Sequence, residues 1–344
     1  MKHLAFIVAS IVMAWSGGLH AEGPPAKAVE VQNRIVLLVD EIHAIRNFPV
    51  VLADRLGYLK DGDLAVTVMN VRYDVWHGDM LMDGRIDAVM AYYHHNVVNQ
   101  SQGKSTEAIV TLGVTPGAKV LVANQVKDKY RTLADLKGSR FIAGGAGSSK
   151  STVANFLLLE GGHKISDYTR LGTDGRDKNV EALGAGSADF VVAPTPEGSF
   201  YVEKGVATVF ADLTTVEGTK KHFGALFPSS TVFMASERIK SHPQFAQHLA
   251  NAFVRTLKYI NTHSAEEIAA LIPDEIIGKG KDRAGYLKVL KEAIPMFATD
   301  GRMPVDGAEK EWRVLSEFNP KYKIVKPEQT YTNKFVDEAL GKLK

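Results

Sequence analysis

A glycine-rich turn that runs into hydroxyl residues has the clearest chemical potential in this sequence. Residues 141–152 read FIAGGAGSSKST, and Gly147 stands directly before Ser148 and Ser149. Glycine lets a backbone turn sharply and approach a ligand closely, because it has no Cβ. A serine at the start of a helix caps the first turn, whose N–H groups attract anions. The stretch therefore predicts either a cradle for a small anion or simply a capped helix after a tight loop.

A cluster of aromatic and imidazole side chains at residues 92–95, which read YYHH, offers a second kind of chemistry. Adjacent residues of an extended chain point to opposite sides, so His94 and His95 would not chelate a metal ion together. Rings of this kind suit an aromatic or planar ligand. We therefore expect Tyr92, Tyr93 and His94 to contact a ligand, and we expect no metal site and no cofactor.

Other candidates for ligand contact stand in the segments that follow expected strands. Ligands of open α/β sheets bind beyond the carboxyl ends of the strands. Each candidate also has a plainer interpretation, as a surface loop side chain, a ring packed under a loop or a solvent-facing acid at a helix start. Arg46 and Arg72 could pair with a carboxylate or sulfonate, although a solvated surface charge is the commoner role. The candidates are His43, Tyr73, Trp76, Thr115, Thr195 and Glu197.

The sequence contains no complete catalytic motif. Residues 144–151 resemble the phosphate-binding pattern G-x-x-x-x-G-K-[ST], but Ser149 replaces the glycine that would wrap the phosphates. There is no H-E-x-x-H zinc pattern and no G-x-S-x-G nucleophile elbow. The chain also has no cysteine, which excludes thiolate metal ligands, cysteine nucleophiles and disulfides. We therefore expect no catalytic residue, while a hydrolase that uses His94 or His95 stays open.

Residues 1–21 have the pattern of a secretory signal peptide. Lys2 precedes an apolar run from Leu4 to Trp15, and Ala21 is the small residue expected at a cleavage site. The run is too short to span a membrane, and without cysteine there is no residue to carry a lipid anchor. We expect a soluble periplasmic protein. Its formal net charge of +2 gives no sign of nucleic-acid binding.

Apolar runs alternate with helical patterns along the rest of the chain, which predicts α/β layers with largely parallel sheets. The pattern runs twice, and a break at residues 113–117 separates the two runs. We expect the chain to cross between two lobes at this break and to return at residues 230–235. This predicts lobe 1 from residues 22–115 plus 232–344 and lobe 2 from residues 116–231. The expected strands are 34–39, 65–69, 86–91, 108–112, 120–123, 168–171, 188–193, 207–210 and 230–235.

The two runs share a local pattern. Residues 80–87 read MLMDGRID and residues 182–189 read ALGAGSAD, so in both a helix end and a glycine turn lead to an aspartate before an apolar strand. The spacing between them is far too long for a solenoid repeat, which favours two similar lobes. Two facing lobes would place the carboxyl ends of their strands at a shared cleft.

Five short motifs also follow one another along the chain. They are residues 48–59 (FPVVLADRLGYL), 83–88 (DGRIDA), 132–138 (TLADLKG), 300–303 (DGRM) and 330–336 (TYTNKFV). In order and spacing these motifs resemble the solute-binding proteins of ABC importers. The resemblance is to the branch that binds nitrate, taurine, alkanesulfonates and pyrimidine precursors of thiamine, and it covers nearly all of the chain after the N-terminal segment.

The resemblance implies a type II periplasmic binding protein fold, in which two α/β lobes joined by two crossing strands close on a ligand by hinge motion. It also implies a partner ABC permease with a cytoplasmic ATPase, and a monomer. The implied ligand is a small organic anion or an aromatic or heterocyclic solute, of the sulfonate, carboxylate or pyrimidine class. Two alternatives stay open: an enzyme of the same fold that acts on a small pyrimidine or aromatic substrate, and a binding protein that serves a sensor.

These expectations combine into one hypothesis for the site. The Gly144–Ser151 turn binds the acidic head of the ligand, while the tyrosines and the tryptophan among the candidates hold its body. On this hypothesis, replacing Ser148 and Ser149 with alanine weakens binding by about 1–3 kcal/mol.

Overall fold

A computed structural model shows how the chain folds. It describes residues 33–61, 63–71, 77–172, 175–278 and 282–343. Residues 33–344 form one compact unit. The predicted signal peptide lies outside the described residues.

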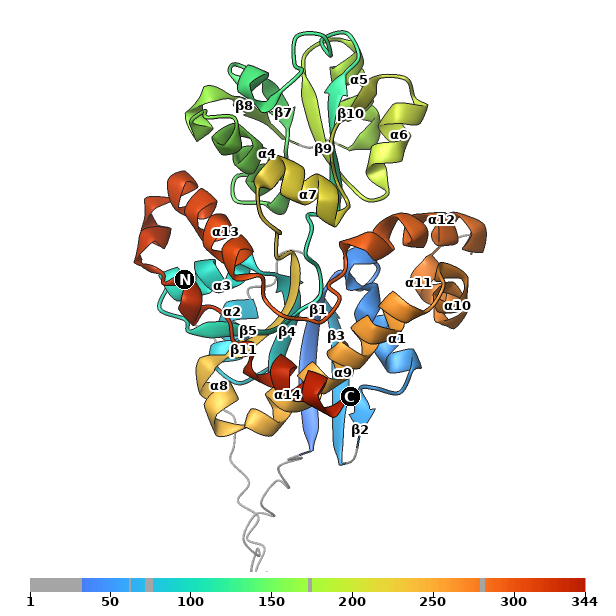
Figure 1. Cartoon of the computed structure of the whole chain (residues 1–344), viewed down its shortest axis with the longest axis vertical. Helices are drawn as coiled ribbons and strands as arrows, with labels where there is room; N and C mark the ends of the chain where they lie inside the picture. The colour runs from blue at the N-terminus through green and yellow to red at the C-terminus, as the bar shows by residue number, and fades with distance from the viewer. Residues whose placement is uncertain (1–32, 62, 72–76, 173–174, 279–281, 344) are drawn as a thin grey trace, which may run out of the picture. The chain divides into compact units, whose positions relative to one another are not determined.

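The first sheet contains six strands (Figure 1). They are β1 (Arg34–Asp40), β2 (Lys60–Asp61), β3 (Leu64–Val71), β4 (Ala88–Tyr92), β5 (Thr106–Thr111) and β11 (Ser230–Ala235). Their order across the sheet is β2-β3-β1-β4-β11-β5. β1 pairs in parallel with β3 and β4. β11 comes from much later in the chain and lies antiparallel between β4 and β5.

The second sheet contains five strands (Figure 1). They are β6 (Ala118–Ala123), β7 (Arg140–Ile142), β8 (Thr169–Leu171), β9 (Phe190–Pro194) and β10 (Ala207–Leu213). Their order is β10-β6-β9-β7-β8. β7 is parallel to β8 and β9, whereas β6 is antiparallel to β9 and β10. The chain thus leaves the first sheet between β5 and β6 and returns to it between β10 and β11.

The predicted α/β fold with two sheets is confirmed, but the prediction of largely parallel sheets is wrong. Both sheets are mixed, because β6 and β11 run antiparallel to both of their neighbours. Parallel pairing follows from a helical crossover within one sheet. β6 and β11 are each reached from the other sheet, so no such crossover sets their direction.

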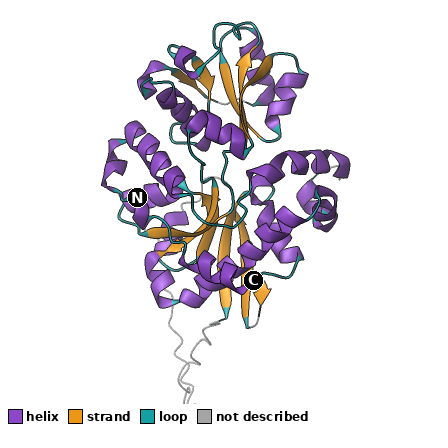
Figure 2. Cartoon of the chain, in the orientation of Figure 1, coloured by secondary structure: helices purple, strands orange, loops and turns teal. Residues whose placement is uncertain are grey.

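Helices lie along both sheets (Figure 2). They are α1 (Phe48–Arg55), α2 (His77–Met82), α3 (His94–Ser101), α4 (Ser149–Glu160), α5 (Arg176–Gly184), α6 (Glu197–Glu203), α7 (Val216–Phe223), α8 (Ser236–Ser241), α9 (Pro243–Thr262), α10 (Ala265–Leu271), α11 (Asp274–Ile277), α12 (Arg283–Ala293), α13 (Val305–Phe318) and α14 (Lys334–Lys342). Short 3₁₀ turns include η1 (Ile45–Asn47), η2 (Leu133–Leu136), η4 (Ile294–Met296), η5 (Pro320–Ile324) and η6 (Pro327–Gln329). None of the described helices has the length and apolarity that a membrane crossing requires.

Each sheet has an apolar core on both faces, which explains its continuous hydrophobic runs. On β1, Leu37 belongs to a core cluster on one face and Leu38 to a cluster on the other. On β9, Val192 and Val191 divide between two clusters in the same way. Successive residues of a strand face opposite sides, so a strand covered on both faces needs apolar residues throughout.

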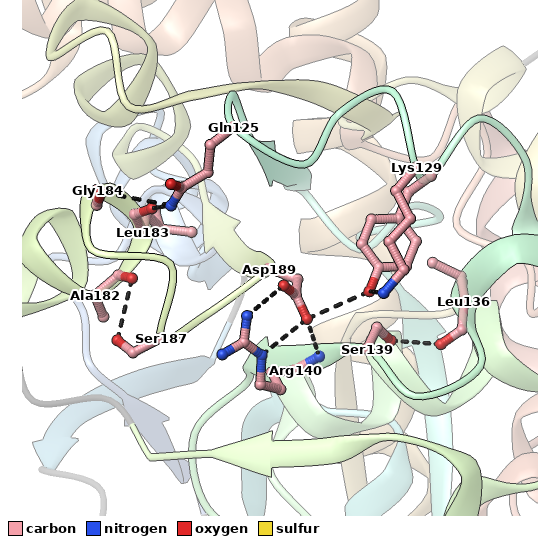
Figure 3. A network of polar contacts seen from close by, with 11 residues as sticks. Gln125, Lys129, Leu136, Ser139, Arg140, Ala182, Leu183, Gly184, Ser187 and Asp189 are labelled. Atoms are coloured by element: carbon pink, nitrogen blue, oxygen red, sulfur yellow. Dashed lines mark hydrogen bonds and ion pairs between the residues drawn. The ribbon is translucent and has the colours of Figure 1, made fainter.

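The aspartates of the repeated pattern have equivalent structural roles. Asp87 accepts a hydrogen bond from the Val36 N–H at 2.8 Å and pairs with Arg238 at 2.6 Å. Asp189 accepts from the Arg140 N–H at 2.8 Å and pairs with the same arginine's guanidinium at 2.6 Å (Figure 3). In both sheets the aspartate therefore fixes the start of one strand to its parallel neighbour, at the end of the sheet opposite to the carboxyl ends.

Candidate functional site

A pocket of about 360 Å³ receives side chains from the elements of both sheets. Its wall comes from the loop after β1, the end of β4, the first crossing segment, the loop after β9, helices α11 and α12, and η4. Its lining residues are His43, Ala44, Ile45, Arg46, Tyr92, Pro116, Gly117, Pro194, Thr195, Pro196, Ile276, Ile277, Asp282, Tyr286, Val289 and Met296. The carboxyl ends of β1, β4 and β9 thus meet at one place, as the α/β pattern predicts.

The loop after β1 turns sharply and carries Arg46 into the pocket wall. Glu41 has a φ of 56°, a left-handed conformation that is uncommon outside glycine. The side-chain amide of Asn47 donates hydrogen bonds to the carbonyl oxygens of Asp40 and Glu41. Asn47 is fully buried. These contacts fix η1 against the end of the strand.

The guanidinium of Arg46 is held by two acids and a ring. Its Nη2 atom lies 3.2 Å from Glu41 Oε2 and 3.7 Å from Asp40 Oδ2. Its Cζ atom lies 5.0 Å from the centroid of the Tyr92 ring, a cation–π distance. Burial raises the pKa of the Asp40 carboxyl, and the charge of Arg46 opposes that rise. Arg46 is therefore an ordered part of the wall, not the solvated surface charge that is commoner for such arginines.

Tyr92 connects this pocket to a much smaller neighbouring hollow. Tyr92, Pro116 and Pro194 line both. Ser149 and Lys150, at the start of α4, line the smaller hollow. The glycine–serine turn therefore borders the same region as the main pocket, from the side of the second sheet.

Several predicted ligand contacts do come together at this region. His43, Tyr92 and Thr195 line the main pocket, and Ser149 lines the smaller hollow. These residues come from four separate segments of the chain. Their common feature is a position at or just beyond the carboxyl end of a strand, or at the start of the helix that follows it.

Two other candidates lie in the interior and do not line either hollow. Tyr93 is fully buried, and its hydroxyl lies 2.6 Å from the Thr330 hydroxyl. Thr115 is fully buried, and its hydroxyl oxygen accepts a hydrogen bond from the Gly117 N–H at 3.3 Å. Both side chains are satisfied within the protein, which corrects the expectation that they contact a ligand.

His94 is buried and belongs to a cluster of imidazoles behind Tyr92, whose other members, His77 and His95, are half-buried. Its ring lies 4.4 Å from the His95 ring, and the His95 ring lies 4.5 Å from that of His77. Tyr92 stacks on His94 with a centroid distance of 5.7 Å. Burial lowers the pKa of His77 and His94 to about 4 and that of His95 well below its usual value. His94 therefore supports the pocket ring from behind and does not line the pocket itself.

The glycine–serine turn is built as predicted, but its hydroxyl groups are largely used within the chain. Gly147 has a φ of 76°, which favours glycine. The Ser148 hydroxyl oxygen accepts from the Ser151 N–H at 3.2 Å, and the same hydroxyl donates to the Ala143 carbonyl. Ser148 is thus the N-cap of α4, which is the plainer of the two interpretations of this stretch.

Glu197 lines neither hollow. It begins α6, and its Oε2 atom lies 3.6 Å from Lys150 Nζ. The remaining candidates, Tyr73 and Trp76, and also Arg72, lie outside the described residues.

The wall contributed by α11 and α12 was missed from the sequence. It brings Ile276, Asp282 and Tyr286 to the pocket. The Tyr286 hydroxyl oxygen is buried without a hydrogen-bond partner in the described part of the chain, and burial raises its pKa to about 12. Asp282 caps α12 by accepting from the Gly285 N–H at 2.8 Å. No motif marks these residues, and only the fold brings them near the loop after β1.

The described residues contain no group of three or more His, Asp or Glu side chains arranged to hold a metal ion. What the pocket offers instead is aromatic faces, apolar side chains, one ion-paired guanidinium and one carboxylate. This set suits reversible binding of a small molecule.

Known proteins resemble this chain over most of its length. A Bacillus subtilis (strain 168) protein, described as a binding protein and called YtlA, is 22% identical over 301 residues, which cover 83% of this chain and 83% of that protein. A solved structure from Bordetella bronchiseptica RB50 is 27% identical with a TM-score of 0.72, over 91% of this chain and 98% of that one. The periplasmic aliphatic sulphonate binding protein SsuA of Escherichia coli is 18% identical with a TM-score of 0.64, over 87% of this chain and 91% of that one.

The structural likeness confirms the periplasmic binding protein fold that the resemblance implied. The family described as NMT1/THI5 like matches residues 45–267, which is more than half of the chain and contains half of the residues that line the pocket. On that match, the chain belongs to the NMT1/THI5-like family.

Proposed function

We propose that the protein is an extracytoplasmic solute-binding protein, which captures one small molecule in the pocket and delivers it to an ABC permease. The observation that carries the proposal is the pocket itself. Its volume of about 360 Å³ lies in the range of small-molecule sites. Its wall is assembled from both sheets and from the segment that joins them, which is the arrangement that a closing two-lobed binder needs.

Binding is coupled to closure in this proposal. Lobe 1 comprises residues 22–115 and 232–344, and lobe 2 comprises residues 116–231. The two lobes rotate about the crossing segments, and the permease receives the closed form. An ion pair between Lys119 of β6 and Glu292 of α12 supports this, because it joins the two lobes beside the pocket.

The relatives support an import function. The Bacillus subtilis relative is described as a binding protein, and the structural relative from Escherichia coli is an aliphatic sulphonate binding protein. We infer a small organic ligand with a planar or apolar body, since Tyr92, Tyr286 and the side chains of Ile276, Ile277 and Val289 form the wall. The protein binds this solute without converting it.

A binding experiment with product analysis tests the proposal. The purified full chain is screened by thermal shift against small metabolites, because a ligand that binds only the folded state raises the apparent stability. Each ligand found is then incubated with the protein and recovered. A single-site binder gives a saturable shift and returns the ligand unchanged. Turnover of the ligand would assign the protein to the enzyme alternative, and no binding at all would reject the proposal.

A further inference from the structure

The charges around the pocket point to the kind of solute that it accepts. Among the described residues, the cation that lines the main pocket is Arg46, and the cation that lines the smaller hollow is Lys150. Both already have acidic partners. Arg46 pairs with Glu41 and Asp40, and Lys150 lies 3.6 Å from a Glu197 oxygen. An incoming anion would have to compete with these carboxylates for the same positive charge.

Arg46 is poorly placed to release its partners. Its side chain is 14% exposed, and that of Asp40 is 13% exposed. Its guanidinium also stands over the Tyr92 ring. Breaking an ion pair in such surroundings leaves a poorly solvated charge behind, which is costly. Arg46 therefore acts as a positioning residue that orients the Tyr92 ring.

Asp282 differs from Arg46 because it has no partner of opposite charge among the described residues. Its side chain lines the pocket, and its one hydrogen bond in the described part of the chain is to the backbone N–H of Gly285. No described cation lies within ion-pair distance of it. The nearby Tyr286 hydroxyl is buried and has no partner in the same part of the chain. Among the described residues, the pocket thus presents one carboxylate without a cationic partner, beside a phenol whose hydroxyl is buried.

We propose that the pocket selects a solute bearing a cationic or neutral nitrogen donor and rejects sulfonates and carboxylates, with Asp282 as the residue that sets this charge selectivity. The inference rests on the proposed function and narrows it. The nitrogen group of the solute donates to the Asp282 carboxylate, while its body lies against Tyr92 and the apolar residues of α11 and α12. This differs from the anionic head group that the glycine–serine turn led us to expect.

The test compares solutes that share one body and differ in charge. The full chain is screened by thermal shift against amines, amidines, neutral amides, carboxylates and sulfonates, including benzylamine, benzamidine, benzamide, benzoate and benzenesulfonate. The best ligands are then titrated by calorimetry into the wild type and into Asp282→Asn. Asparagine caps a helix about as well as aspartate does, so this variant loses the charge and keeps the cap of α12.

A matched control is available on another helix. Asp306 is exposed at the start of α13 and accepts from the Gly307 N–H, but it lines neither hollow. Asp306→Asn should bind every solute as the wild type does. Asp282→Asn should bind the best cationic ligand about tenfold more weakly, the loss expected for a hydrogen bond to a charged group.

Each result of these experiments either supports or overturns the proposed charge selectivity. Hits confined to amines, amidines or amides, together with the loss in Asp282→Asn alone, support the inference. A carboxylate or sulfonate that binds the wild type at least as well as its amine counterpart overturns it and leaves the proposed function standing. Amine binding that is equal in Asp282→Asn overturns the role of Asp282. A screen without any ligand contradicts the proposed function, and the inference with it.

Discussion

Two consecutive tyrosines, Tyr92 and Tyr93, differ in whether they face the pocket or the core. Tyr92 ends β4 and faces the pocket, whereas Tyr93 turns into the core and bonds to Thr330. Successive side chains point to opposite sides at a strand end, so only one of the pair can line the pocket. Burial also affects polar side chains that do not face the pocket. It shifts their pKa values, and those shifts make the stability of the protein depend on pH.

The imidazole cluster behind Tyr92 should make the protein sensitive to acid. The pKa of His77 and of His94 is lowered to about 4 by burial, below the ordinary value of 6.5. As the pH falls below 6.5, the unfolded state takes up protons before the folded state does, so stability is full above that pH and declines toward pH 4. We expect a loss of about 1–2 kcal/mol per histidine by pH 5, measured by urea unfolding.

The control for this prediction is the exposed His43. Replacing His77 with glutamine should flatten the dependence of stability on pH between 7.5 and 5, and replacing His43 with glutamine should not. Equal free energies of unfolding at pH 7.5 and pH 5 in the wild type would contradict the expectation that the imidazoles of the cluster stay unprotonated in the folded protein.

Glu311 should behave in the reverse sense. It is 1% exposed on α13, and neither carboxyl oxygen has a hydrogen-bond partner among the described residues. Burial raises the pKa of Glu311 well above its ordinary value. In the folded protein the Glu311 carboxyl therefore keeps a proton that it loses in the unfolded chain above pH 4.5. The free energy of unfolding falls as the pH rises past that point.

Glutamine at position 311 keeps the shape and removes the proton equilibrium. We expect Glu311→Gln to raise the free energy of unfolding by about 1–3 kcal/mol at pH 7.5, with little gain at pH 5. Glu309→Gln, an exposed change on the same helix, should have no effect at either pH. A Glu311→Gln variant that is less stable at pH 7.5 would show that the carboxylate has a partner in solution.

At the scale of elements, the helix after the glycine turn shows a local motif that the sequence predicts and whose first hydroxyl the structure uses as a cap. The Ser148 hydroxyl is occupied by the Ser151 N–H and the Ala143 carbonyl. A hydroxyl with two partners inside the protein has little left for a ligand. The element that brings a carboxylate and a further ring to the pocket is α12, with Asp282 as its N-cap and Tyr286 in its first turn.

Ser148→Ala should therefore act on stability and not on binding. We expect a loss of about 1 kcal/mol in the free energy of unfolding, as for other N-cap serines, with ligand affinity unchanged within twofold. Ser149→Ala, one position along the same turn, should leave stability nearly unchanged. Calorimetry and urea unfolding on both variants measure the two effects separately. A loss of binding of about 1–3 kcal/mol in Ser148→Ala would restore the original hypothesis for this turn.

Much of the element order could be predicted, because it depends on local patterns. The apolar run of β1 and the cap at Ser148 are both visible over a few residues. The pairing direction of β11 was not predictable, since it depends on where the chain returns to the first sheet. The same limit explains the pocket lining: His43 follows a strand and Tyr92 ends one, so the sequence could nominate both, whereas Tyr286 belongs to a helix that only the fold brings to the pocket.

At the scale of the whole molecule, the two sheets are linked in two different ways. α13 joins them through apolar packing, since its Val314 belongs to a core cluster of the second sheet and its Leu315 to a cluster of the first. α12 approaches the second sheet through ion pairs, Lys119–Glu292 and Lys288–Glu203. Packed apolar contacts persist during small rotations. The Lys288–Glu203 pair is exposed and separates at low cost, whereas the Lys119–Glu292 pair is mostly buried and holds α12 more firmly. We therefore expect the pocket to open on the side of α12.

The Lys119–Glu292 pair should slow release of the bound solute. Removing it with Glu292→Gln should raise the dissociation rate about fivefold, the change expected for a pair worth about 1 kcal/mol. Stopped-flow measurements on the single and double variants at positions 119 and 292 give the coupling between the two side chains. The exposed pair Lys323–Glu317, which lies within one part of the molecule, is the matched control. Equal release rates in all variants would show that closure does not involve α12.

The most direct test of the whole account is a calorimetric titration of the best ligand from the charge-sorted screen into three proteins: the wild type, Tyr92→Ala and Tyr259→Ala. Tyr92 lines both hollows, while Tyr259 stacks on His263 and lines neither. The account predicts one solute per chain, affinity at least tenfold weaker in Tyr92→Ala from the lost ring contact, and wild-type affinity in Tyr259→Ala. Wild-type affinity in Tyr92→Ala would show that the solute binds elsewhere and would contradict the account.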